Sequence, residues 1–254
     1  RQGEYSDEDG TELATGDVYR NVNGNIFSQE LKLVSTLPGK LHWTVGAYYN
    51  RSRMQQQFYN NFNDYQGRGY ISESSYDQNQ QAFSQYVNVN YDLTKSITLF
   101  GGLNHMSDAR QLLNFRTIKY GLNTLNFAPE GALTNQLGGL LGIQVQLAQH
   151  LQTYFKVSKG FKPGGFAANN TVAQAQLKAF KPESLVSYEL GFKSDPLPGK
   201  LRLNGAAFYY DYHNQQVVSS FLLDNYGPLG TYVNVPHSAI WGIELSAEAH
   251  PVSH

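Results

Sequence analysis

Paired carboxylates and a glycine-rich segment are the features of this sequence most able to carry catalysis. Glu189 and Glu244 could act as an acid–base pair only if the fold brought them together. The stretch 160–165 lacks the Gly-Lys-Ser/Thr ending of a phosphate-binding loop, so it is better explained as a turn after a strand. No Gly-x-Ser-x-Gly nucleophile elbow occurs. We therefore predict no catalytic residues, and no enzyme.

Histidines and an acidic run were considered as metal ligands. Only His250 and His254 have the i, i+4 spacing of a helical zinc motif, and Pro251 between them argues against a helix. The run 7–10 resembles the start of a calcium loop, but Glu12 stands where that loop needs glycine. We predict no metal site and no cofactor.

Ligand binding fits the sequence better than catalysis does. Aromatic and amide side chains are concentrated at 55–62 and 65–70, where they offer stacking faces and hydrogen-bonding groups for a bulky polar ligand. An ordinary polar surface loop explains the same composition equally well. Charged residues on the polar faces of predicted strands are the other candidates. The predicted ligand-binding residues, in loops or a lumen, are Phe58, Tyr59, Tyr65, Lys156, Glu189, Arg202 and Glu244.

The composition limits the classes of protein to consider. The chain has 254 residues, 18 Tyr, 24 Gly and no Cys, which favours strands and turns and excludes a disulfide framework. A formal net charge of -1 argues against nucleic-acid binding. No run approaches the roughly 18 apolar residues of a membrane-spanning helix. A barrel strand needs no such run, because it shows apolar residues only at alternate positions.

Alternation of apolar and polar residues recurs along the chain and decides the predicted architecture. In the stretch 42–50, for example, Trp43, Val45 and Ala47 share one face while His42 and Thr44 share the other. About nine such strands are visible. They cover 27–33, 42–50, 83–91, 97–104, 141–147, 151–158, 188–193, 201–210 and 241–248.

The connections between these strands differ in length at alternate ends. Short ones at 37–40, 92–95, 148–150 and 195–200 alternate with long polar ones near 51–79, 105–135, 161–184 and 213–237. Short periplasmic turns and long extracellular loops are typical of a transmembrane antiparallel β-barrel. A soluble β-sandwich, with its polar face in water, is the alternative. We expect residues 1–254 to be one part of a barrel domain, with 1–24 a loop or the end of a preceding strand.

Several motifs in sequential order resemble TonB-dependent receptors. The first is Ser-Lys-Gly-Phe-Lys-Pro-Gly-Gly-Phe at 158–166, and similar motifs follow at 180–193, 201–212 and 239–245. Each motif is short, and their order and spacing make the resemblance specific. It covers most of the chain from Phe27 onward.

The resemblance implies an all-β fold that is part of a barrel of about 22 strands, plugged by a domain that this chain lacks. It also implies import of a scarce nutrient, such as a ferric siderophore, cobalamin or an oligosaccharide, across the outer membrane of a Gram-negative bacterium. The implied partners are the inner-membrane TonB complex, acting through the plug, the nutrient, and outer-membrane lipid. A passive outer-membrane porin is the alternative function. Nucleic acid is not an expected partner.

Overall fold

The computed structural model describes residues 2–7, 10, 12–13, 16–64, 71–119, 124–168, 171, 173–223 and 227–250. Tyr65 lies outside these ranges. Within them, the only helix is a short 3-10 turn, η1, and no helix is long and apolar enough to cross a membrane. The elements are β1 (Gln2–Asp7), β2 (Asp17–Val34), β3 (Leu41–Asn61), β4 (Ile71–Asp92), β5 (Ile97–Lys119), β6 (Leu125–Asn126), β7 (Glu130–Ala148), β8 (Leu151–Lys162), η1 (Gln174–Leu177), β9 (Glu183–Leu197), β10 (Leu201–Leu223) and β11 (Gly227–Ala249).

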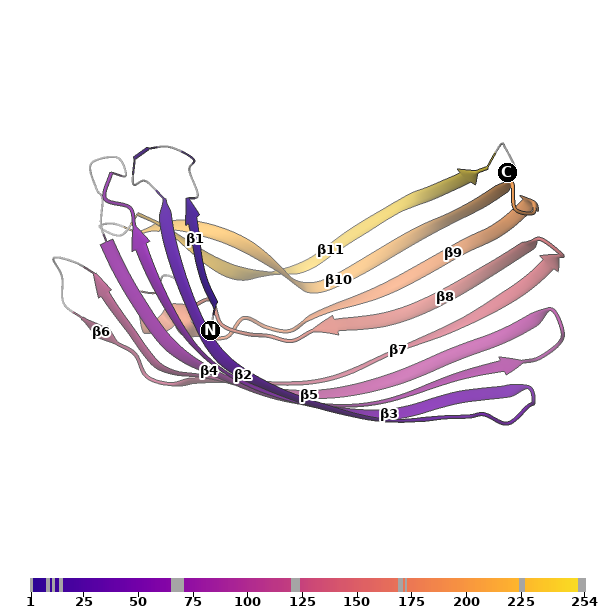
Figure 1. Ribbon diagram of the computed structural model, residues 1–254, viewed down its shortest axis with the longest axis horizontal. Helices are drawn as coiled ribbons and strands as arrows, with labels where there is room; N and C mark the ends of the chain where they lie inside the picture. The colour runs from indigo at the N-terminus through magenta and orange to yellow at the C-terminus, as the bar shows by residue number, and fades with distance from the viewer. Residues whose placement is uncertain are drawn as a thin grey trace.

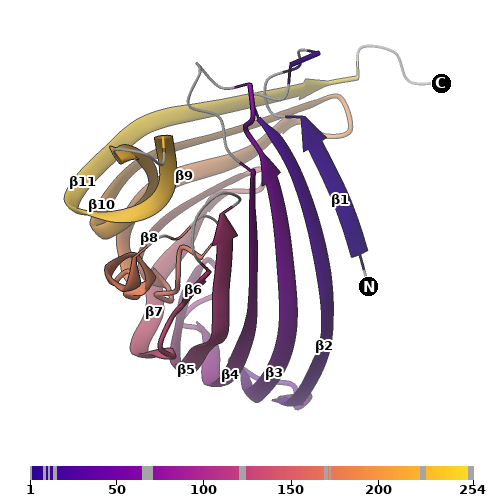
Figure 2. The same ribbon diagram turned by 90° about the vertical axis from the view of Figure 1, so that its left-hand side faces the viewer.

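All the strands belong to one antiparallel sheet. Their order is β1-β2-β3-β4-β5-β7-β8-β9-β10-β11, with β6 paired to β5. The sheet curves into an open trough whose edges are β1 and β11 (Figures 1 and 2). The predicted all-β antiparallel barrel wall is confirmed. The sandwich alternative is wrong, because the described strands form a single sheet.

The strands are longer than the sequence pattern predicts. The nine predicted strands correspond to β2–β5 and β7–β11, but β3, β4 and β5 have 21, 22 and 23 residues. The predicted loops at 51–79, 105–135 and 213–237 are therefore wrong over most of their length. The alternation fades there because both faces become polar, as expected of strands that continue beyond the membrane into water. The segment 1–24, predicted to be a loop or the end of a preceding strand, contains the strand β1, and β2 begins within it at Asp17.

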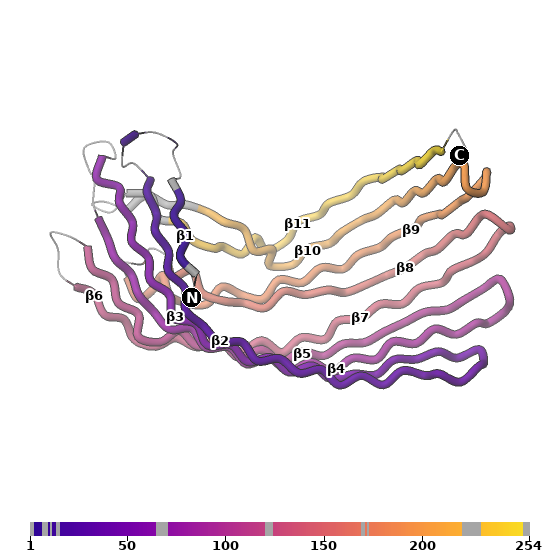
Figure 3. The backbone as a smooth tube through the Cα atoms, in the orientation of Figure 1, coloured from indigo at the N-terminus to yellow at the C-terminus, as the bar shows by residue number. Residues whose placement is uncertain are grey.

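The ends of the strands are sorted as predicted. The short connections after β2, β4, β7 and β9 all lie at one end of the trough, opposite the connection between β8 and β9 (Figure 3). That connection runs over residues 163–182 and is called the inward loop below, because it folds back onto the sheet. By the general rule for such barrels, the short-turn end is periplasmic.

One face of the sheet is apolar near the short-turn end. It exposes large hydrophobic residues in neighbouring strands, as a lipid-facing surface does. The register aligns Trp43, Val89, Gly101, Leu141, Val157, Tyr188, Tyr209 and Trp241 across eight strands on this outer face. Trp241 is 77% exposed and Leu141 is 70% exposed. Trp43, Tyr188, Tyr209 and Trp241 thus lie on the outer face, where aromatic residues of a membrane interface are expected.

The opposite, inner face is polar and contains the small core of the domain. Phe58, Tyr76, Leu112 and Phe115 of β3–β5 pack there with Ala168 and Leu177 of the inward loop. Leu177 is fully buried. The packed core therefore lies between the sheet and the inward loop, and not between two sheets.

A bulge in β5 brings Phe115 to this core. Asn114 has φ 53, a left-handed conformation that asparagine tolerates, and its side-chain amide donates to Asp77 at 2.6 Å. The register against β4 shifts at this point. The extra residue reverses the odd–even alternation, so that Phe115 and Thr117 join the inner face.

Candidate functional site

A charged cluster lies on the inner face of β8 and β9. Lys156 and Glu189 are cross-strand partners in the register, and Lys156 Nζ lies 3.0 Å from Glu189 Oε2. The Tyr154 hydroxyl donates to Glu189 Oε1 at 2.7 Å, and Lys156 Nζ lies 5.9 Å from the centre of the Tyr154 ring. Glu189 thus has a partner on each oxygen. The cluster presents a fixed ammonium and a fixed phenol to the interior of the trough.

Gly191 makes room for the Tyr154 ring. A Cβ atom on Gly191 would lie 2.5 Å from Tyr154 Oη and 2.6 Å from Cζ, far inside ordinary contact distance. Two other glycines on this face also lie directly under an aromatic ring of the neighbouring strand: Gly46 under Tyr86, and Gly142 under Phe100. Glycine on one strand therefore lets an aromatic ring from the next strand lie flat against the wall.

A second group, the aromatic platform, lies further from the short-turn end. Tyr76 stacks on Phe58 with ring centres 6.0 Å apart and on Phe115 with ring centres 5.4 Å apart. Arg20 lies over the Phe58 ring at 5.4 Å and donates to Gln56 at 2.9 Å. Burial raises the pKa of Tyr76 to about 12, against a lowering effect of Arg20. The Tyr76 hydroxyl therefore stays protonated at neutral pH.

A buried carboxylate supports the wall beside the platform. Asp108 is 2% exposed, accepts from Arg110 Nε at 2.7 Å, and also accepts from the Gln80 side chain. Both carboxylate oxygens are satisfied, as a buried charge requires. A Cβ atom on Gly165 would lie 3.1 Å from Arg110 Nη1. The second glycine of the Pro-Gly-Gly-Phe motif thus lets the inward loop approach β5.

The inward loop is held to the sheet on both sides of the trough. Gln216 of β10 donates to the carbonyls of Pro163 and Lys181, at 2.9 and 3.1 Å. Asn234 of β11 accepts from the Lys181 backbone at 2.8 Å. On the other side, Gln174 donates to Glu130 of β7 at 2.7 Å. These bonds, with the burial of Leu177, keep the loop over the aromatic platform.

The structure separates the predicted ligand-binding residues. Lys156 and Glu189 form one cluster, whereas Phe58 lies in the platform. Arg202 is near the short turn after β9, where it makes ion pairs with Asp195 at 3.1 Å and Glu248 at 3.2 Å. Glu244 is exposed on the inner face of the edge strand β11. Because β10 lies between β11 and β9, Glu244 does not pair with Glu189 of β9. The partners of Glu189 are Tyr154 and Lys156.

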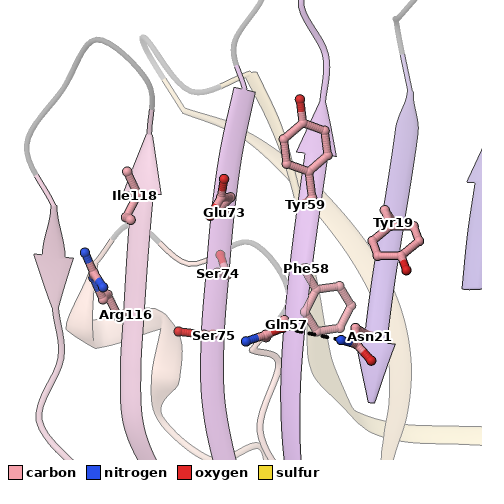
Figure 4. A pocket seen from close by; sticks show the side chains of 10 residues that line it. All are labelled: Tyr19, Asn21, Gln57, Phe58, Tyr59, Glu73, Ser74, Ser75, Arg116 and Ile118. Atoms are coloured by element: carbon pink, nitrogen blue, oxygen red, sulfur yellow. Dashed lines mark hydrogen bonds between the residues drawn. The ribbon is translucent and has the colours of Figure 1, made fainter. Parts of the chain in front are cut away.

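Tyr59 is on the other side of the wall. The expectation that it lies in a loop or faces a lumen is wrong, because it follows Phe58 in β3 and alternation turns it to the outer face. There it lines a hollow of about 470 Å³ with Tyr19, Glu73 and Ile118 (Figure 4). The Asn21 side chain donates to Gln57 at 3.5 Å in the same hollow.

Sequence reasoning missed several residues that shape the inner face. Tyr154 was visible as a polar-face residue but carried no signal of its bond to Glu189. Tyr76 and Phe115 lay in segments predicted to be loops, and Arg20 lay in the segment predicted to be a loop or the end of a preceding strand. A continued search for alternation beyond the apolar strands could have placed Tyr76, but not Phe115, because of the bulge.

Comparison with known proteins gives the family. The family model for the TonB dependent receptor-like β-barrel matches residues 1–250. The chain belongs to the TonB-dependent receptor family. This family is an outer-membrane family of Gram-negative bacteria, and its members bind ligands such as siderophores and interact with TonB.

Individual relatives agree with this assignment. The pesticin receptor of Yersinia enterocolitica is 26% identical over 185 residues, which cover 70% of this chain and 25% of the receptor. The ferric yersiniabactin uptake receptor FyuA of Yersinia pestis has the same fold, with a TM-score of 0.76, 20% identity, and coverage of 94% of this chain and 34% of that one. The siderophore receptor PiuA of Acinetobacter baumannii has a TM-score of 0.69 at 19% identity, covering 93% and 37%. The chain thus spans from a quarter to somewhat more than a third of the length of these relatives.

Proposed function

We propose that the full-length protein resides in the outer membrane and imports a ferric siderophore, with energy delivered by TonB. The observation that carries this proposal is the inner face, where an aromatic platform and a charged cluster lie along one wall, with a loop folded over the platform. The rings of the platform are buried beneath the inward loop, so the groups that this face offers to a bulky polar ligand are the ammonium and the phenol of the charged cluster.

The charges on this face suit an anionic chelate. Arg20 lies above the platform, and Lys156 lies closer to the periplasmic end. Arg20 can attract a negatively charged ligand at the entrance, and Lys156, whose charge is balanced by Glu189, can donate a hydrogen bond to it further inside. Two proteins of similar structure, the ferric yersiniabactin uptake receptor FyuA and the siderophore receptor PiuA, support a siderophore over cobalamin or an oligosaccharide.

Coupling to TonB would pass through the plug, which lies outside this chain. The family assignment favours this active mechanism over a passive porin. The inward loop also favours it, because a loop bonded to both sides of the wall narrows the path that free diffusion would need.

Growth and uptake separate these functions. A deletion strain is supplied with ferric siderophores, cobalamin or oligosaccharides in turn, and uptake is measured with and without TonB. We expect one class of ferric siderophore to be taken up only when both the protein and TonB are present. Uptake that continues without TonB would support the porin, and restored uptake of cobalamin or an oligosaccharide alone would reject the siderophore.

A further inference from the structure

The outer face of β2–β5 changes from apolar to basic over a short distance. Phe27 and Tyr49 have ring centres 6.4 Å apart, and Tyr49 is the register partner of Phe83 in β4. These rings form an aromatic row at the upper limit of the apolar surface. Arg51 and Arg53 follow on the same face of β3.

This position corresponds to the outer boundary of the membrane. The stretch from Leu41, the first residue of β3, to Tyr49 has about the 9–11 residues that a tilted strand needs to cross the bilayer core. Aromatic residues concentrate at membrane interfaces. Because Leu41 is at the short-turn, periplasmic end, Arg51 and Arg53 lie at the level of the headgroups in the outer leaflet.

The two arginines line a hollow of about 230 Å³ together with the side-chain amides of Asn79, Gln81 and Gln111. Among the described residues, the arginines that form ion pairs are Arg110 and Arg202, and not these two. Guanidinium groups with neighbouring amides are well suited to binding the oxygens of a phosphate group. Asp77, which lines an adjoining hollow with Arg53, accepts a hydrogen bond from Asn114 at 2.6 Å.

An apolar groove lies below the aromatic row on the same strands. It has a volume of about 460 Å³, and small residues in β3, Gly46 and Ala47, help to form its floor. Gln85 and His105 supply polar groups at its edge, one register step below the aromatic row. The apolar side chains that line it are Leu31, Leu33, Val45, Val87, Leu103 and Leu137.

We propose that this outer wall binds a phosphorylated glycolipid of the outer leaflet, of the lipid A type. Its phosphate would be held by Arg51 and Arg53, and an acyl chain would lie in the groove. The order of groups along β3 matches such a molecule, with the cations above the aromatic row and the groove below it. The proposal rests on the outer-membrane placement in the proposed function, but it does not depend on which nutrient is imported.

Binding to the purified full-length protein in detergent tests the proposal. Native mass spectrometry would measure the affinity for lipid A, for dephosphorylated lipid A, and for lipid A in competition with inorganic phosphate. A basic residue near an anionic lipid surface contributes about fivefold in affinity, so the double variant R51Q/R53Q should bind lipid A about 25-fold more weakly. Dephosphorylated lipid A should bind the wild-type protein as weakly as lipid A binds the double variant.

Two further variants distinguish a built site from general basicity. R116Q removes an exposed arginine from the same outer face, but outside both hollows, and should leave lipid A affinity unchanged. A47F fills the groove and should weaken binding without removing charge. An equal loss of lipid A affinity in R116Q and R51Q/R53Q would overturn the proposed site. Unchanged lipid A affinity in the double variant, or complete displacement of lipid A by millimolar inorganic phosphate, would overturn it as well. Heat-dependent migration of each variant on gels checks that the barrel is folded, and fractionation checks the outer-membrane placement separately.

Discussion

Replacing Gly191 by alanine should disrupt the charged cluster without changing any charged residue. The added Cβ atom would lie 2.5 Å from Tyr154 Oη, whereas ordinary contacts begin at 3.4 Å, so the ring must move by 0.9 Å (3.4 − 2.5) or more. The Tyr154–Glu189 hydrogen bond is 2.7 Å long, and such a displacement is enough to break it. Overpacking of this kind typically costs about 1–3 kcal/mol.

Urea unfolding of the full-length protein in detergent measures this cost. Gly160→Ala is the matched control, because nothing lies within 4 Å of a Cβ atom at that position. We expect G191A to lower the free energy of unfolding by about 1–3 kcal/mol, and G160A to leave it within about 0.5 kcal/mol.

A double-mutant cycle identifies the cause. Removing the ring as well, in G191A/Y154A, should cost less than the sum of the two single changes, because alanine at 191 then meets no ring. Equal stabilities of G191A and G160A, or additive effects in the cycle, would refute the proposed contact between Gly191 and Tyr154.

Three other predictions concern the loop, the two faces and a buried phenol. L177A should release the inward loop, because truncating a fully buried leucine costs about 2–5 kcal/mol. Hydrogen exchange in residues 173–182 should then rise in L177A. The control K178A, at an exposed neighbouring position, should leave hydrogen exchange there unchanged. L141R on the outer face should destabilise the barrel by up to about 4 kcal/mol, whereas the same change at inner-facing Leu140 should be tolerated, and equal effects would contradict the assignment of faces. Because the pKa of Tyr76 is about 12 in the folded protein and 10.0 ordinarily, its contribution to stability is complete below pH 10 and is lost as the pH rises towards 12. The free energy of unfolding should therefore fall by at most about 2.7 kcal/mol between pH 10 and pH 12 because of this group. The same measurement on Y76F should lack this fall.

The sequence predicted strands well where one face meets lipid. There, alternation is strong, and all nine apolar strands appear in the structure. Beyond the membrane level both faces are polar, so strands such as the outer part of β3 have the composition of loops. The bulge at Asn114 adds a second obstacle, because it reverses the facing of every later residue in β5.

The candidate site was predictable only in part for a similar reason. Alternation placed Lys156 and Glu189 on polar faces, but their pairing depends on the register between β8 and β9, which pairs them directly across the two strands. The platform depends on contacts between the inward loop and β3–β5, over long sequence separations that no local pattern encodes.

The central claim is that the wall has one lipid-facing and one water-filled side. Residues 1–254 contain no cysteine, so single cysteines introduced at Ile143, Gln144, Val145 and Gln146 of β7 are the only thiols in this part of the barrel, and any cysteine elsewhere in the full-length protein is replaced first. In the full-length protein in membranes, a small hydrophilic maleimide should label positions 144 and 146 and leave 143 and 145 protected by lipid. Uniform labelling of all four positions, or the opposite alternation, would contradict the account.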